Sequence, residues 1–239
     1  MELSVFKKIL DDYVEKYEND VDGLFYWGCS LYFSAGLGFC ALCNYYDCDI
    51  IIDSGTGKYG LSTEIFAKCF PNKKIITIDT HSYYNNEIFI KNRLKQYKNI
   101  EFIKGYSESE IPKILNDNKS KKIAIMYDGP KGKRAYELFK IHRQNKNVLF
   151  AGFDDCGGSN KYTMGSYNFM KSTDEVLCWN DEDWYHEKYG YLDKNRYFID
   201  NNYEHPKVGL MADSPIFFER HPLEHLYPMG TGSCFIINE

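Results

Sequence analysis

The chain has 239 residues, of which 44% are hydrophobic and 26% are charged, and its net charge is −5. A chain of this length and composition can bury a sizeable core without disulfide or metal staples, which excludes an intrinsically disordered protein. The acidic balance argues against nucleic acid as the main partner, because proteins that bind a nucleic-acid backbone usually carry a basic field.

The sequence before residue 49 predicts one uncharged helix and one amphipathic helix. Residues 23–46 carry no charge, and this stretch is long enough to span a membrane. Glycines, Cys and Ser interrupt this stretch and a buried strand follows it, so we expect a buried helix and loop instead. Before it lies an amphipathic helix, whose apolar residues recur at helical spacing: Leu3, Phe6, Leu10, Val14 and Tyr17.

From residue 49 onwards, short apolar runs alternate with helical patterns. The expected strands are 49–53, 74–79, 99–105, 122–129 and 147–155, with helices at 61–70, 86–97, 110–116 and 134–145. This alternation is typical of βαβ units. The expected fold class is therefore α/β, a Rossmann-like doubly wound, mostly parallel seven-stranded sheet with helices on both faces. The rhythm fades after residue 156, and residues 233–238 predict a last strand.

Eight cysteines raise the question of disulfides or a metal. The opening residues "MELSVFKKIL" do not read as a secretory signal, so we expect a cytoplasmic protein with reduced thiols. Cys40, Cys43 and Cys48 form a C-x-x-C-x4-C pattern that invites a zinc interpretation. No second pair and no paired histidines complete such a site, which disfavours zinc.

A glycine motif follows the first strand of the alternating region. Gly55-x-Gly57-x-x-Gly60 matches the dinucleotide fingerprint, in which glycines permit a tight turn and a close approach of backbone to ligand. Asp53 lies two positions earlier, where a carboxylate would repel a pyrophosphate at the helix N-terminus but attract a cationic ligand. Asp79 ends the second strand, where an acid can accept hydrogen bonds from ribose hydroxyls.

Three further acids are expected at the same edge of the sheet. Asp128 follows the fourth strand, and Asp154 and Asp155 follow the fifth. Acids that converge there would repel one another without a cation, and their hard oxygens suit Mg²⁺, Mn²⁺ or Ca²⁺. Helix capping is the alternative, and it is the preferred one for Asp128 taken alone.

The motifs "DSGTGKYG", "IITID", "FIKGYSES" and "AIMYDGPKG" together resemble the successive motifs of class I methyltransferases that use S-adenosylmethionine (SAM). The resemblance covers about residues 49–156. It implies that the methionine moiety lies beside the first motif, the ribose beside the second and the adenine beside the third. For Ser107, a plain turn residue is the alternative. The cofactor-binding set is Asp53, Gly55, Gly57, Asp79, Thr80, Tyr106, Ser107 and Asp128.

Within that class, "YDG" followed by "FDDCGG" is similar to the metal-dependent sugar O-methyltransferases of the macrocin and mycinamicin type. The resemblance implies that Asp128, Asp154 and Asp155 hold a Mg²⁺ ion that orients two sugar hydroxyls. We further expect a domain plan with a helical N-terminal cap at 1–48 and a SAM-binding core at 49–156. Residues 157–239 would complete the same domain with a specificity insertion and the last strand.

The general base is where the sequence departs from those relatives. They tend to carry an acid two positions after the first metal ligand, where this chain has Pro130. Lys131 and His81 are the replacements we consider, and Lys131 would need a lowered pKa to act as a base. The alternative for Lys131 is a solvated basic turn. The expected catalytic set is Asp128, Lys131 and His81.

The leading hypothesis is a metal-assisted O-methyltransferase acting on a hydroxyl of a sugar or nucleotide-sugar. A phenol-type acceptor, an NAD-dependent oxidoreductase and a non-catalytic SAM-binding module are the alternatives. Neither nucleic acid nor a membrane is an expected partner, and a homo-oligomer is left open. Aromatic residues of the tail would either pack in the core or cover the acceptor: Trp179, Trp184, Tyr185, His186, Tyr189 and Tyr191.

Overall fold

The computed structural model describes residues 1–17, 33–57, 60–80, 87–156, 164–179, 184–185, 187–189 and 233–238. Its strands are β1 (Ile50–Ser54), β2 (Lys74–Asp79), β3 (Ile100–Lys104), β4 (Ile123–Tyr127), β5 (Val148–Phe153), β6 (Cys178–Trp179) and β7 (Cys234–Ile237). They form a seven-stranded sheet in the order β3-β2-β1-β4-β5-β7-β6. The first five strands pair in parallel, and β7 pairs antiparallel with both β5 and β6. The expected α/β class and the mostly parallel sheet are confirmed.

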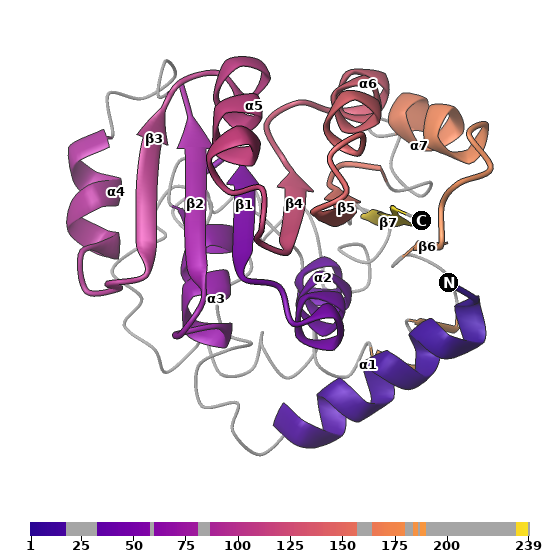
Figure 1. Cartoon of the computed structure of the whole chain (residues 1–239). Coiled ribbons are helices and arrows are strands. Elements are labelled where there is room, and N and C mark those ends of the chain that lie inside the picture. Colours follow the sequence, from indigo (N-terminus) through magenta and orange to yellow (C-terminus); the bar gives the residue numbers. More distant parts are fainter. Residues whose placement is uncertain are drawn as a thin grey trace, which may run out of the picture.

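Helices flank the sheet on both sides, as Figure 1 shows. They are α1 (Leu3–Tyr17), α2 (Phe33–Tyr46), α3 (Leu61–Cys69), α4 (Glu87–Leu94), α5 (Ser107–Asp117), α6 (Gly132–His142) and α7 (Met164–Lys171). The alternation expected between residues 49 and 155 is confirmed element by element. Both α7 and β6 were not expected, because they lie where the apolar rhythm of the sequence fades.

Alternation along β1 assigns its side chains to two separate core clusters. Ile51 packs with residues of α1, α2 and α3, whereas Ile50 and Ile52 pack with residues of α5 and α6. Successive side chains of a strand point to opposite faces. The same alternation therefore turns Asp53 toward α3 and Ser54 toward α5, which decides the partners of both residues.

The uncharged N-terminal stretch contains α2, whose described side chains are largely buried, with Leu37, Phe39 and Leu42 in the core. The expected buried helix is thus confirmed for this part, and residues 23–32 lie outside the described residues. Within the described ranges, the helices are all too short or too polar to cross a membrane.

The side chain of His142, on α6, is turned into the core and away from solvent. Its side chain is only 2% exposed, and its Nδ1 lies 2.7 Å from the hydroxyl of Tyr127. His142 follows Leu138 and Phe139 by four and three residues, so it extends their buried stripe on α6. Burial lowers the pKa of His142 to about 4.

The tail aromatics that the structure describes pack against the body of the molecule. The Lys7 ammonium of α1 lies 4.1 Å from the centroid of the Trp184 ring, and the Tyr189 hydroxyl donates to Asp11 at 2.6 Å. Tyr185 belongs to the same core cluster as α1. These contacts favour packing over a cover for the acceptor. His186 and Tyr191 lie outside the described residues, and the division into cap, core and C-terminal part stays a prediction.

Candidate functional site

The glycine turn after β1 packs against the turn after β4. Gly55 has a φ of 124°, and a Cβ placed on it would come within 2.3 Å of the Gly129 backbone nitrogen. The Gly129 amide in turn donates to the Ser54 carbonyl at 2.5 Å. Only glycine satisfies both the backbone angle and this close approach. The turns after β1 and β4 therefore pack into one continuous surface, which we call the floor of the site. It lies at the carboxyl edge of the sheet, where ligands bind in open α/β sheets.

Asp53 lies completely buried under this floor. Its Oδ2 accepts hydrogen bonds from the hydroxyls of Ser62 at 2.8 Å and Thr63 at 2.6 Å, both from the first turn of α3. Its Oδ1 is buried without a hydrogen-bond partner among the described residues. Burial raises the pKa of Asp53 to about 7, the two hydroxyls oppose that rise, and the charges of Asp128 and Asp79 add to it. This carboxylate would be stabilised by a cation on its Oδ1 side.

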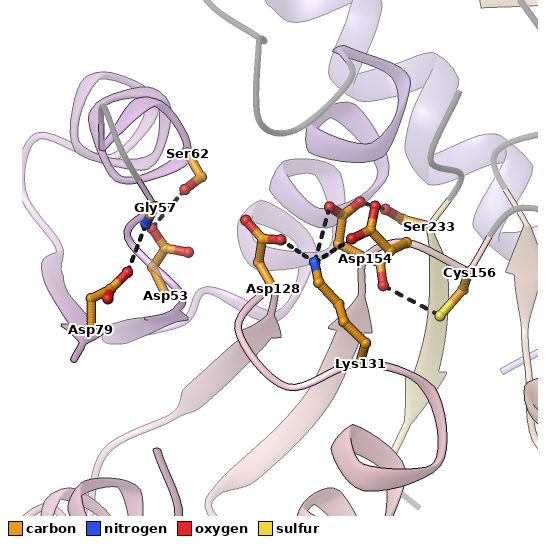
Figure 2. Close-up of polar contacts among 10 residues, drawn as sticks. Asp53, Gly57, Ser62, Asp79, Asp128, Lys131, Asp154, Cys156 and Ser233 are labelled. Carbon is orange, nitrogen blue, oxygen red and sulfur yellow. Dashed lines mark hydrogen bonds and ion pairs between the residues drawn. The ribbon is translucent and has the colours of Figure 1, made fainter. Parts of the chain in front are cut away.

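Asp79, at the end of β2, lies beside the same turn. Its Oδ2 accepts the Gly57 backbone N–H at 2.9 Å, as Figure 2 shows. Asp79 is half-buried, as is the next residue, Thr80. Asp53 and Asp79 are thus brought to one turn from two strands, the arrangement that the sequence predicts for the cofactor-binding acids.

In the third motif, "FIKGYSES", one of the two predicted adenine-binding residues is exposed and the other is buried. Tyr106 is 64% exposed just before α5, an open position for a stacking partner. Ser107 is buried instead, and its Oγ lies 2.5 Å from the Ser54 Oγ. The Ser107 side chain thus ties the start of α5 to the end of β1. Its contact with an adenine, like that of Tyr106, stays a prediction.

The three acids expected at the ends of β4 and β5 do converge. Ligand oxygens of Asp128, Asp154 and Asp155 all lie within 4.8 Å of one another, and within the described ranges this is the only such group of His, Cys, Asp or Glu side chains. Asp155 has a φ of 56°, which lets two consecutive carboxylates face one point. Ser233 donates to Asp154 Oδ1 at 2.7 Å. We call Asp128, Asp154 and Asp155 the acidic triad.

The acidic triad surrounds the ammonium of Lys131, which Figure 2 shows beside Asp128 and Asp154. The Lys131 Nζ is ion-paired with Asp128, lies 2.8 Å from Asp155 Oδ2 and lies 3.7 Å from Asp154 Oδ2. Burial lowers the pKa of Lys131, but the three carboxylates raise it more, so the net shift is upward. A base would need the opposite shift. The ion pairs make Lys131 a counter-cation of the triad and not a solvated turn residue, and they disfavour a base, whose assignment stays a prediction.

Asp154 is the most enclosed member of the triad. Burial raises its pKa well above the usual range, the charge of Asp128 adds to the rise, and Lys131 opposes it. Three carboxylates with one lysine leave a surplus of negative charge, so the group has capacity for a further cation. His81, the other candidate base, lies outside the described residues.

The cysteine pattern does not build a comparable centre. Cys40, Cys43 and Cys48 are buried in the core beside α1 and α3. The fold brings Cys69 to Cys40, with 3.8 Å between the sulfurs, which the linear spacing does not reveal. Burial and the neighbouring thiols raise the pKa values of Cys40 and Cys43, which favours protonated thiols over metal-binding thiolates.

No protein-family model and no curated protein matches the chain. Among solved structures, the chain is similar to the SAH-bound methyltransferase PaMTH1 of Podospora anserina, with 12% sequence identity and a TM-score of 0.44. The similarity covers 96% of this chain and 87% of that one.

Proposed function

We propose that the chain is a SAM-dependent O-methyltransferase, assisted by a divalent metal, that acts on a hydroxyl of a sugar or nucleotide-sugar. The observation that carries the proposal is the buried Oδ1 of Asp53 beside the glycine turn, which has no hydrogen-bond partner among the residues that the structure describes. SAM brings an α-ammonium and a sulfonium, two positive centres that would pair with a carboxylate in this position.

A dinucleotide fits the same observations less well. Its pyrophosphate would meet two carboxylates at the turn, Asp53 and Asp79, where a phosphate-binding turn needs only N–H donors. The Gly57 N–H, which would be one of these donors, is already engaged by Asp79. The sheet also departs from the dinucleotide-binding order 3-2-1-4-5-6 because β7 lies between β5 and β6.

Asp128 links the cofactor site to the acidic triad. Its charge acts on Asp53 on one side and pairs with Lys131 on the other, and Figure 2 shows it between these two residues. Methyl transfer is an in-line displacement that depends on the alignment of donor and acceptor. An acceptor hydroxyl held at the triad would therefore lie next to the methyl group of SAM bound at the glycine turn.

The acidic triad fits a hard divalent cation by its chemistry, because it offers carboxylate oxygens close together and in excess of the local positive charge. Asp128, Asp154 and Asp155 would hold the ion, which would lower the pKa of a coordinated hydroxyl and fix its direction. Ser233 orients the Asp154 carboxylate through Oδ1. Lys131 offsets part of the negative charge of the triad.

The test is a methyl-transfer assay with SAM and two acceptor panels, nucleotide-sugars and small phenols, each with Mg²⁺ or with EDTA. The expected result is a singly methylated nucleotide-sugar, detected by mass spectrometry with Mg²⁺ and lost with EDTA and in Asp154→Asn. A methylated phenol would favour the other acceptor class. Transfer that is equally fast in EDTA would remove the metal from the proposal, and transfer to neither panel would oppose the sugar acceptor.

A further inference from the structure

Four buried hydroxyl groups form a connected network beneath the glycine turn. Thr56 Oγ1 lies 2.5 Å from Thr77 Oγ1, which lies 3.0 Å from Thr63 Oγ1, and Thr63 donates to Asp53 Oδ2 at 2.6 Å. Ser62 supplies the second bond to that oxygen. All of these hydroxyl-bearing residues are 0% exposed. The network joins three elements, the glycine turn, β2 and α3.

Thr63 is the donor in both of its contacts, to Asp53 and to Thr77. A hydroxyl group has a single proton, so the two acceptors compete for it, and an ionised Asp53 is the stronger acceptor. Thr77 and Thr56 then hold the Thr63 oxygen in place beside the carboxylate.

Neither Ser62 nor Thr63 is used as a helix cap. The N-cap position of α3 is Gly60, and it makes no side-chain hydrogen bond. A hydroxyl at a helix start ordinarily satisfies a backbone N–H of its own helix. Here both hydroxyls are directed to one oxygen of Asp53, which fixes the plane of the carboxylate and leaves Oδ1 free.

We propose that Thr63, supported by Thr77, is a positioning residue that aims the free Oδ1 of Asp53 at the ammonium of the ligand. This inference rests on the proposed function, since SAM supplies the ammonium. The role is specific to the amino-acid part of the ligand. The adenine and ribose of the same ligand would be held elsewhere, at Tyr106 and Asp79.

The experiment compares two ligands by calorimetry, SAM and 5′-methylthioadenosine, which has the adenosine and the sulfur but no amino-acid part. Thr63→Val should weaken SAM binding roughly tenfold or more, because a hydrogen bond to a charged group is lost. Binding of 5′-methylthioadenosine should change by less than about twofold. Thr63→Ser, which restores the hydroxyl, should recover SAM binding. Thr173→Val, a threonine-to-valine change at the end of α7, is the matched control.

A double-mutant cycle with Asp53→Asn separates positioning from packing. In the Asp53→Asn background, Thr63→Val should have no further effect on the ratio of the two affinities. An equal loss of affinity for both ligands in Thr63→Val, or no recovery of SAM affinity in Thr63→Ser, would overturn the inference. Either result would leave the proposed function standing. Failure of the unaltered protein to bind SAM would instead refute the proposed function, and the inference with it.

Should Thr63→Val fail to fold, Thr77→Val takes its place in the same comparison. Thr77 does not touch Asp53, so its removal should shift the preference for SAM in the same direction but by a smaller factor. An unchanged ratio of affinities in a folded Thr77→Val protein would show that the row of hydroxyls does not act on Asp53, and would overturn the inference.

Discussion

The ammonium of Lys131 lies 2.8 Å from a carboxylate oxygen of Asp155, although the lysine belongs to the turn after β4 and the aspartate to the turn after β5. The same ammonium pairs with Asp128 and faces Asp154. One lysine thus occupies the centre of the group that a divalent cation would bind. A metal ion bound there would therefore compete with the lysine for the same oxygens.

Replacing Lys131 should expose this competition. We expect Lys131→Met to lower the melting temperature in EDTA, because three neighbouring carboxylates lose their only described ion-pair partner. Mg²⁺ or Mn²⁺ should then stabilise the variant more than the unaltered protein. Differential scanning fluorimetry over a metal titration measures both effects. Lys133→Met, which removes an exposed lysine of α6, is the control. The same metal response in Lys131→Met and in the unaltered protein would argue against a cation site here.

Asp53 should make stability depend on pH. Its pKa is raised by burial to about 7 in the folded protein, so the folded state holds this proton more tightly than the unfolded state. The cost of the buried charge is therefore full above pH about 7 and declines as the pH falls toward 4. We expect Asp53→Asn to raise the melting temperature more at pH 8 than at pH 5, while SAM binding is lost. If the difference in melting temperature between Asp53→Asn and the unaltered protein did not depend on pH, the Asp53 carboxylate would not be buried and without an ion-pair partner as described.

Gly55 should not tolerate a side chain. Alanine there would take an unfavourable φ and meet the Gly129 backbone, so we expect Gly55→Ala to lower the free energy of unfolding by about 3 kcal/mol or more. Gly165→Ala in α7 meets open space and should change it by no more than about 1 kcal/mol, toward higher stability. Urea denaturation compares the two. Similar changes in the free energy of unfolding for the two variants would mean that the turn after β1 does not pack against the turn after β4.

Asp79 and Asp53 should differ in the part of the ligand that they hold. If Asp79 accepts hydrogen bonds from the ribose hydroxyls, Asp79→Asn should weaken the binding of SAM and of 5′-methylthioadenosine by the same factor, roughly tenfold. Asp53→Asn should weaken SAM alone. Calorimetry with both ligands on both variants gives four values to compare. Selective loss of SAM in Asp79→Asn would place the amino-acid part of the ligand at Asp79 instead.

Much of the fold follows from patterns within the sequence. The short apolar run at 49–53 predicts a buried strand, and the alternation of side chains along a strand puts Asp53 and Ser54 on opposite faces. The convergence of Asp128 with Asp154 follows from a general property of parallel sheets, whose strand ends meet at one edge.

Other features depend on contacts that no linear pattern contains. Lys131 reads as part of a basic turn, and only the position of the β5 end makes it the partner of three acids. Ser62 and Thr63 read as helix-start residues, because a cap and a bond to a neighbouring strand use the same residue types. His142 could have been recognised, since it continues the apolar stripe of α6.

The most direct test of the central claim is calorimetric titration of the protein with SAM and, separately, with NAD, each in Mg²⁺ and in EDTA. We expect binding of SAM, no binding of NAD, and loss of SAM binding in Asp53→Asn. Binding of NAD without binding of SAM would contradict this expectation, because Asp53 would then lie beside a pyrophosphate and the cation expected at its Oδ1 would be absent.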